Sequence, residues 1–356
     1  MKKVLSYSCI IIGLVLLFSG TSRDVVAYIW ERKHHQLWWG EHQSNFGDLS
    51  NIAYLDDIKV FQTPNDYNFT PPADTSGPKN IDLYLFGDSY TEDVPCAAFA
   101  HVNTCHFGRK GHHDLVYKLD KSKRNVLLIE TAERYVRSNY QNGDIYNHIR
   151  KDLPPALTLA ISEPGPVYAS VGAGLHVADF FNPNINQNLE YLLFNVNAMN
   201  KPRLLKADMN YYLFNRGSGD VVIADDGRHL FLKETVEPKN ECSSYQPFSN
   251  EDVTAWANNL NVIYEHYKAE GFDEVYFAIV PNPASVIQPA NYNNLIPKLQ
   301  TSPGLKMQMV DVYSHYKNAG NPRQFYRAGD THWNNKGMQL WLMLVNEQLS
   351  RQSAKP

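Results

Sequence analysis

Short apolar runs alternate with longer amphipathic segments from residue 81 to the end of the chain. The runs that we predict as strands are 81–87, 124–131, 273–283 and 305–313. The segments that we predict as helices are 113–123, 251–271 and 334–350. This strand–helix–strand alternation predicts an α/β domain with a mainly parallel sheet.

The segment 251–271 carries the fullest helix signal. Its apolar residues recur at helical spacing, from Val253 to Tyr267. Glu251 and Asp252 carry negative charge at the end where a helix favours it, and Gly271 is a natural end. We therefore expect a long amphipathic helix that packs on the sheet.

The chain divides into three parts by pattern. We predict a signal anchor or transmembrane segment at 1–25, a juxtamembrane and linker region at 26–80, and a catalytic domain at 81–356. Residues 140–225 are less regular, and we expect an insertion or cap there that contains a helix at 185–199.

The N-terminus has the pattern of an export signal. Lys2 and Lys3 precede an uncharged run of 17 residues, 4–20. A spanning helix needs about 17–25 residues, so this run is at the short limit. The positive end should stay in the cytoplasm, which puts the body in the periplasm or outside the cell. No clean cleavage site follows, which favours an uncleaved anchor over a cleaved signal peptide.

The composition does not favour nucleic-acid binding, and it leaves open whether two of the cysteines form a disulfide. The chain is 43% hydrophobic and 20% charged, with a net charge of −4, so nothing favours nucleic-acid binding. Cys96 and Cys105 either form a short-loop disulfide, which export would permit, or remain free. No Cys-x-x-Cys pair suggests a zinc site, and we expect no metal or cofactor.

Two short motifs carry candidate chemistry. Asp88 and Ser89 follow the strand at 81–87, and Asp330 and His332 precede the helix at 334–350. A serine nucleophile needs a base, and the base needs a group that orients it. Residues i and i+2 of an extended segment point the same way, so Asp330 would hold one imidazole nitrogen while the other faces Ser89. Each motif alone also fits an ordinary turn or helix start.

The order of these motifs resembles the SGNH (GDSL-like) hydrolase superfamily. Within it, "DTHW" (330–333) is similar to the polysaccharide O-acetyltransferase branch typified by the alginate acetylation proteins. Segments 127–136 and 277–287 also resemble strands of that branch. The serine precedes Asp-x-His here, whereas it follows in the alginate proteins themselves. The resemblance implies a three-layer sandwich and a Ser89–His332–Asp330 triad.

The resemblance also implies a function. An exported O-acetyltransferase would form an acetyl-serine at Ser89 and pass the acetyl group to a glycan hydroxyl. A membrane-bound O-acyltransferase partner would supply the acetyl group, because acetyl-coenzyme A is cytoplasmic. The alternatives are an esterase or deacetylase with the same triad, and a non-catalytic glycan-binding protein on the same fold.

Further residues are candidates for oxyanion or substrate binding. They are Asp88, Tyr90, Asn282, Arg134 and Trp333. The backbone N–H of Ser89 or Tyr90 would supply one oxyanion donor, and Asn282 a second. Arg134 either lines the site or forms a surface ion pair with Glu130. Trp333 either stacks on a sugar ring or packs His332 in place.

Overall fold

The computed structural model describes residues 2–21, 46–55, 78–92, 94–140, 145–152, 197–217 and 219–351. The chain forms two units. One contains Met1–Ser44 and Pro155–Phe214, and the other contains Asn45–Pro154 and Asn215–Pro356. The second unit holds the predicted strands and every candidate site residue.

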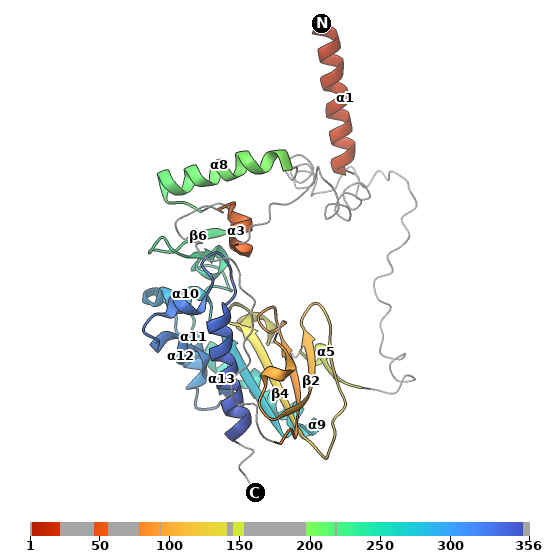
Figure 1. The fold of residues 1–356 in the computed structure, drawn as a ribbon, viewed down its shortest axis with the longest axis vertical. Helices are drawn as coiled ribbons and strands as arrows, with labels where there is room; N and C mark the ends of the chain where they lie inside the picture. The colour runs from red at the N-terminus through yellow and green to blue at the C-terminus, as the bar shows by residue number, and fades with distance from the viewer. Residues whose placement is uncertain are drawn as a thin grey trace. The chain divides into compact units, whose positions relative to one another are not determined.

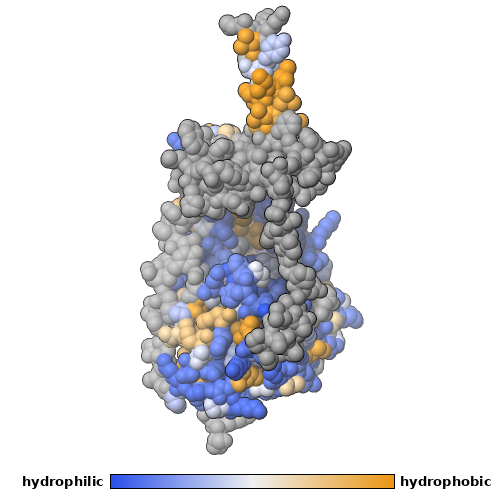
Figure 2. All heavy atoms as spheres, turned by 90° about the vertical axis from the view of Figure 1, so that its right-hand side faces the viewer, coloured by the Kyte–Doolittle hydropathy of each residue, from blue (hydrophilic) through white to orange (hydrophobic). Residues whose placement is uncertain are grey.

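The first unit is described by two helices, α1 (Lys2–Thr21) and α8 (Asn197–Phe214). Many apolar side chains of α1 are exposed, and they give it the orange surface in Figure 2. Within the described ranges, none of the helices combines the length and apolar character needed to cross a membrane. Most of the helix predicted at 185–199 lies outside the described residues; its last three residues belong to α8. The membrane anchor stays a prediction.

The second unit is built on a five-stranded sheet with the order β2-β1-β4-β8-β9 (Figure 1). The strands are β1 (Ile81–Gly87), β2 (Val102–Arg109), β4 (Arg124–Ala132), β8 (Glu274–Val280) and β9 (Gln308–Val310). Every neighbouring pair is parallel. All residues of β1 are buried, as expected for a strand covered on both faces. The predicted α/β fold with a mainly parallel sheet is confirmed.

Helices cover both faces of this sheet. Alternate side chains of a strand point to opposite faces. Tyr84 of β1 packs edge-to-face on Phe272, which follows α9 (Asn250–Glu270) and contacts its Tyr267. On the other face, Arg124 of β4 donates a hydrogen bond to the carbonyl of Leu349 in α13 (Asn335–Arg351). α9 and α13 therefore flank the sheet.

Shorter elements complete the second unit. The helices are α3 (Asp48–Ala53), α4 (Val136–Asn139), α5 (Ile145–His148), α10 (Pro283–Ile287), α11 (Leu295–Gln300) and α12 (Val312–Asn318). The short strands β3 (Leu115–Tyr117) and β5 (Ile149–Lys151) pair in parallel, and β6 (Val221–Ile223) and β7 (Leu230–Leu232) pair antiparallel. Single 3₁₀ turns are Cys96–Ala98, Glu133–Tyr135, Lys233–Thr235, Pro289–Asn291 and Pro322–Phe325.

The local signals at the long helix are confirmed. Ser249 and Asp252 form a reciprocal capping box at the start of α9. Gly271 ends the helix in the left-handed conformation, with φ of 107°. These caps explain why the predicted boundaries lie within one residue of the observed ones.

Two predicted elements are wrong in part. The segment 113–123 was expected to be helical, but it contains the strand β3, in which Leu115 and Tyr117 are buried and Val116 is exposed. That alternation has the period of a strand. The strand predicted at 305–313 ends at Val310, because the carboxylate of Asp311 accepts the Ser314 N–H and starts α12.

The question of the two cysteines is resolved. Cys96 and Cys105 form a disulfide, which ties the turn before β2 to the strand itself. Cys9 and Cys242 are free. The bond joins the edge strand of the sheet to the chain that leads into it.

Removing Trp341 should destabilise the second unit strongly. Its side chain has no exposed surface and contacts Phe99 and Trp333. We expect Trp341→Ala to lower the free energy of unfolding by about 3–5 kcal/mol in urea denaturation. Met343→Ala, on the exposed side of the same helix, should change it by less than about 0.5 kcal/mol. Equal losses in the two variants would contradict the packing of α13 described here.

Candidate active site

The turn after β1 presents Ser89. A Cβ at Gly87 would lie 2.3 Å from Thr91 Oγ1 and 2.6 Å from Glu130 Oε2, so the strand must end in glycine. The carboxylate of Asp88 accepts the N–H of Tyr90 at 2.9 Å and the N–H of Ala132 at 2.8 Å. Asp88 therefore fastens the turn that carries Ser89 to the end of β4.

Glu130 supports the same turn from below. It is buried in β4 and accepts the Asp88 N–H at 3.0 Å. Burial and the charge of Asp88 raise the pKa of the Glu130 carboxyl well above its usual range. The second oxygen, Oε1, is buried without a partner among the described residues. Glu130 is thus a structural acceptor beneath the catalytic turn.

The loop before α13 presents His332. Its Nε2 lies 2.7 Å from Ser89 Oγ, and its Nδ1 lies 2.7 Å from Asp330 Oδ1. Both distances are those of hydrogen bonds, and the order of contacts is that of a serine, base and orienting carboxylate. Ser89 and His332 are half-buried, so a substrate has access to them. The structure therefore brings together the three residues predicted as the triad.

The environment of Asp330 keeps it ionised. Burial by itself raises the pKa of its carboxyl. The hydrogen bonds and charge of His332, with the nearby charge of Arg327, outweigh burial, and the net effect lowers the pKa. Arg327 Nη1 lies 3.7 Å from Asp330 Oδ2. An ionised Asp330 is what an orienting carboxylate requires.

Tyr90 packs against His332, and Trp333 packs behind Tyr90. The Tyr90 ring lies 4.9 Å from the imidazole, and the hydroxyl of Tyr90 donates to the carbonyl of Thr331. Trp333 is buried and packs on Tyr90 and Trp341. Trp333 therefore packs behind Tyr90, the ring that lies against His332, and its burial does not support stacking on a sugar ring. The N–H of Tyr90 bonds to Asp88, which leaves the N–H of Ser89 as the candidate oxyanion donor.

Arg134 is buried next to the site. Its guanidinium carbon lies 4.8 Å from the ring centre of Tyr135 and 6.0 Å from that of Tyr90. Glu130 is also buried, so the surface ion pair between these two residues is excluded. Arg134 Nε has no hydrogen-bond partner in the described part of the chain.

Asn282 belongs to a different cluster. It is fully buried after β8, and its Nδ2 donates to Ser244 Oγ at 2.9 Å. Its N–H donates to the carboxylate of Glu133 at 2.9 Å. A residue without exposed surface does not reach a substrate carbonyl in this conformation, so we find no support for Asn282 as the second oxyanion donor.

The sequence did not indicate Asp48, which contacts the catalytic loop from α3. Its carboxylate accepts hydrogen bonds from Thr331, the residue between Asp330 and His332. Residues 46–55 were expected to be part of a linker. An aspartate at a helix start is the only local signal there, and it does not indicate a contact with a residue so far along the chain.

Asp48, Asp330 and His332 are also the residues that suit a metal ion best in the described ranges. One ligand atom from each lies within 4.8 Å of the others. Both nitrogens of His332 already bond to Ser89 and Asp330. The arrangement is therefore explained without an ion.

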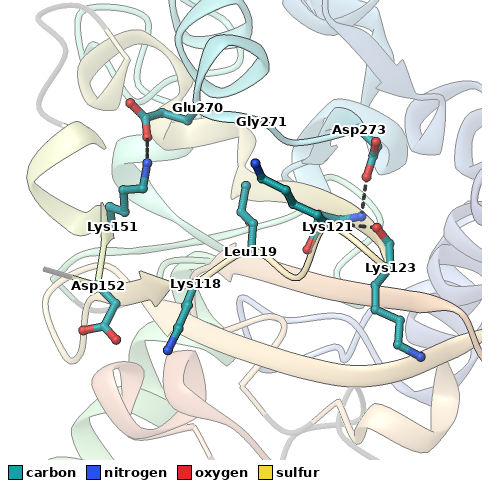
Figure 3. Close-up of a pocket in the computed structure, with 10 residues that line it drawn as sticks. Lys118, Leu119, Lys121, Lys123, Lys151, Asp152, Glu270, Gly271 and Asp273 are labelled. Atoms are coloured by element: carbon teal, nitrogen blue, oxygen red, sulfur yellow. Dashed lines mark hydrogen bonds and ion pairs between the residues drawn. The ribbon is translucent and has the colours of Figure 1, made fainter.

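A pocket of about 350 Å³ lies at the other end of the sheet. It includes Asn125, near the start of β4, and Asp273, directly before β8. Figure 3 shows that Lys151 pairs with Glu270 and that the ammonium groups of the other labelled lysines point in different directions. Ser89 follows the carboxyl end of β1, so this pocket is separate from the triad.

Comparisons of the chain with models of protein families, with curated proteins and with solved structures found no match. The superfamily resemblance therefore rests on the two motifs and their order, and family membership stays a prediction. The distances among Ser89, His332 and Asp330 do not depend on that resemblance.

Replacing Glu130 should change how stability depends on pH. Because its pKa is raised in the folded state, its contribution to stability is present below about 4.5 and is lost as the pH rises towards the folded value. A glutamine side chain in its place would not titrate. We expect Glu130→Gln to gain stability relative to the wild type as the pH rises, by at most about 1.4 kcal/mol per pH unit.

Urea denaturation from pH 5 to pH 8 measures this difference. The exposed Glu265 provides a matched control, and Glu265→Gln should follow the wild-type curve. A constant difference between Glu130→Gln and the wild type across this range would show that Glu130 is ionised throughout.

Proposed function

We propose that this chain is an exported serine acyltransferase of the SGNH type that O-acetylates a glycan. The observation that carries the proposal is the hydrogen-bonded series Ser89–His332–Asp330 at the carboxyl end of a parallel α/β sheet. Reactive residues of such sheets collect at that end. On this proposal the helices on both faces form the outer layers of an SGNH-like three-layer sandwich.

The first half-reaction loads the enzyme. Ser89 Oγ attacks the acetyl carbonyl of the donor while its proton passes to His332 Nε2. Asp330 stabilises the imidazolium that forms, and the N–H of Ser89 faces the developing oxyanion. The bond to the donor's leaving group then breaks, and the leaving group takes the proton from His332. The product is an acetyl ester on Ser89.

The second half-reaction transfers the acetyl group from Ser89 to the acceptor. His332, neutral again, takes the proton of a sugar hydroxyl whose oxygen attacks the acetyl-serine carbonyl. Collapse of the intermediate breaks the Ser89 ester bond and returns the proton to Ser89 Oγ. The acetylated glycan leaves, and the triad is restored without a cofactor.

An exported location would require a partner protein to supply the acetyl group. The Cys96–Cys105 disulfide is typical of an oxidising compartment, which agrees with export through the predicted N-terminal anchor. Cytoplasmic acetyl-coenzyme A would not reach Ser89 there. We propose a membrane-bound O-acyltransferase as the partner that supplies acetyl groups and a glycan as the acceptor.

An esterase or deacetylase is the second candidate. It would use the same three residues, with water in place of the sugar hydroxyl. The half-exposed His332 favours this candidate, because water reaches the base directly. A non-catalytic glycan-binding protein has less support, because glycan binding alone does not require a serine within 2.7 Å of an oriented histidine.

Replacing triad residues should abolish acyl transfer. With p-nitrophenyl acetate and the purified full-length chain, we expect Asp330→Asn to lower kcat by about 10,000-fold. Ser89→Ala should prevent formation of the acetyl-enzyme, because the nucleophile is gone. Ser138→Ala, an exposed serine after the 3₁₀ turn at 133–135, should have wild-type activity.

Mass spectrometry of added oligosaccharides distinguishes the candidates. Acetylated sugar that depends on Ser89 would support the transferase, and free acetate alone would support the esterase. Equal activity in wild type and Ser89→Ala would contradict both and leave the binding protein.

A further inference from the structure

Asp48 binds the central residue of the catalytic loop through both carboxylate oxygens. Oδ1 accepts the Thr331 N–H at 2.8 Å, and Oδ2 accepts the Thr331 hydroxyl at 2.6 Å. Thr331 lies between the two triad residues of this loop, and its Oγ1 is 3.2 Å from His332 Nδ1. A displacement of Thr331 would therefore move Asp330 and His332 together.

The backbone around Asp48 fits the same loop closely. The N–H of Ser50 donates to the carbonyl of Gly329 at 3.0 Å. Gly47 has a φ of 127°, and a Cβ there would lie 2.4 Å from that carbonyl and 2.5 Å from Asp330 Cβ. Only glycine allows this approach. The contact thus involves side chain and backbone on both partners.

The segment that carries Asp48 is itself fixed in the second unit. Leu49, Ser50, Ala53 and Leu55 have no exposed surface. These residues give α3 a buried face despite its length of six residues. Asp48 is therefore held by packing and does not depend on its contact with Thr331 for its position.

The Asp48 side chain is 42% exposed but lies close to two charged groups. Burial and the charge of Asp330 both raise the pKa of its carboxyl. Its Oδ2 nevertheless lies 3.9 Å from His332 Nδ1, so the imidazolium formed during acyl transfer has a second carboxylate beside it.

We propose that Asp48 is a positioning residue of the active site, which holds Thr331 so that His332 Nε2 stays in contact with Ser89 Oγ. The inference rests on the proposed serine chemistry and does not depend on whether the acceptor is sugar or water. It makes residues 47–50, far from the sheet in sequence, a required part of the site.

A double-mutant cycle on the full-length chain tests the proposal. The variants are Asp48→Asn, Thr331→Val and the two combined, and Asp252→Asn in the α9 capping box is the matched control. The probe is a fluorophosphonate, whose phosphorus Ser89 Oγ attacks with loss of fluoride. The rate of this labelling reports activation of Ser89 without any donor or glycan.

Each single variant should slow labelling about tenfold or more, and the double variant should be no slower than Asp48→Asn alone, because Thr331→Val removes only the hydroxyl contact, which Asp48→Asn also disrupts. Asp252→Asn should label at the wild-type rate. Thr331→Ser, which keeps the hydroxyl, should restore most of the rate lost in Thr331→Val. With an activated ester, Asp48→Asn should lower kcat and leave KM unchanged, since Asp48 does not touch the substrate.

Other results would overturn the proposal. Wild-type labelling of Asp48→Asn would show that Asp48 does not position the loop, and effects that multiply in the double variant would show that it does not act through the Thr331 hydroxyl. If Asp48→Asn does not fold, the comparison of Thr331→Val with Thr331→Ser decides, and equal labelling of those two excludes a role for the hydroxyl contact. A wild type that labels but acetylates no sugar would refute the transferase alone, whereas a wild type that does not label would refute both.

Discussion

The parallel pairing of β1 with β4 at the centre of the sheet determines where the reactive groups lie. In this register Leu85 lies beside Leu128 and Phe86 beside Ile129, so both strands end at the same edge. The Asp88 carboxylate then spans the short distance between the two strand ends and accepts an N–H from each side. Ser89 is held by the geometry of the sheet, and its contact with His332 depends on it.

Side-chain carboxylates accept the backbone N–H groups of the loops at this site, as the carbonyl groups of neighbouring strands do within the sheet. Loop N–H groups near a buried sheet need acceptors, and side-chain oxygens supply them here. The acceptors are Asp48, Asp88, Glu130 and Asp330, which take the N–H groups of Thr331, Tyr90, Asp88 and His332 respectively. Two of these carboxylates, those of Asp48 and Asp330, lie 3.9 Å and 2.7 Å from His332 Nδ1, so negative charge is concentrated on that side of the imidazole.

This concentration has two opposite effects. It stabilises a positive imidazolium, which the proposed acyl-transfer steps would require. It also sets the carboxylates against one another: burial and the charge of Asp330 raise the pKa of Asp48, and burial and the charge of Asp88 raise the pKa of Glu130. Asp330 is the exception, because it bonds directly to His332, and its pKa falls. The same group of charges therefore favours a protonated His332 and opposes folding.

The sequence predicted the parts of the fold that have a local cause. The buried central strands are recognisable in the sequence as short apolar runs. The helix α9 was recognisable from the periodicity of its apolar residues and from Gly271 at its end. The edge strand β2 was missed, because its exposed and buried residues follow no regular pattern. The motifs at Ser89 and at Asp330–His332 predicted the triad, since nucleophile and base are recognisable from residue types and order.

Asp48 was not predictable in the same way. It lies 282 residues before Asp330 in the chain, and nothing periodic links the two. Asn282 is the opposite case: its position after a strand suggested that it binds the oxyanion, but it is completely buried and the structure does not support that role. Residue type and strand order indicate which edge of the sheet a side chain reaches, but packing decides whether it faces a substrate.

The position of α3 bears on where this domain begins. By strand pattern alone the domain starts at Ile81, and a truncation there would keep every strand and the whole triad. It would also remove the side chains of Leu49 and Leu55, and apolar surface that they cover would become exposed to water. The Gly329 carbonyl would lose its bond from Ser50, and Thr331 would lose both bonds from Asp48. Such a fragment would contain every strand of the sheet and the whole triad but would lack contacts that the triad loop makes, so moving this domain into another protein would require the segment around Asp48 as well as the sheet.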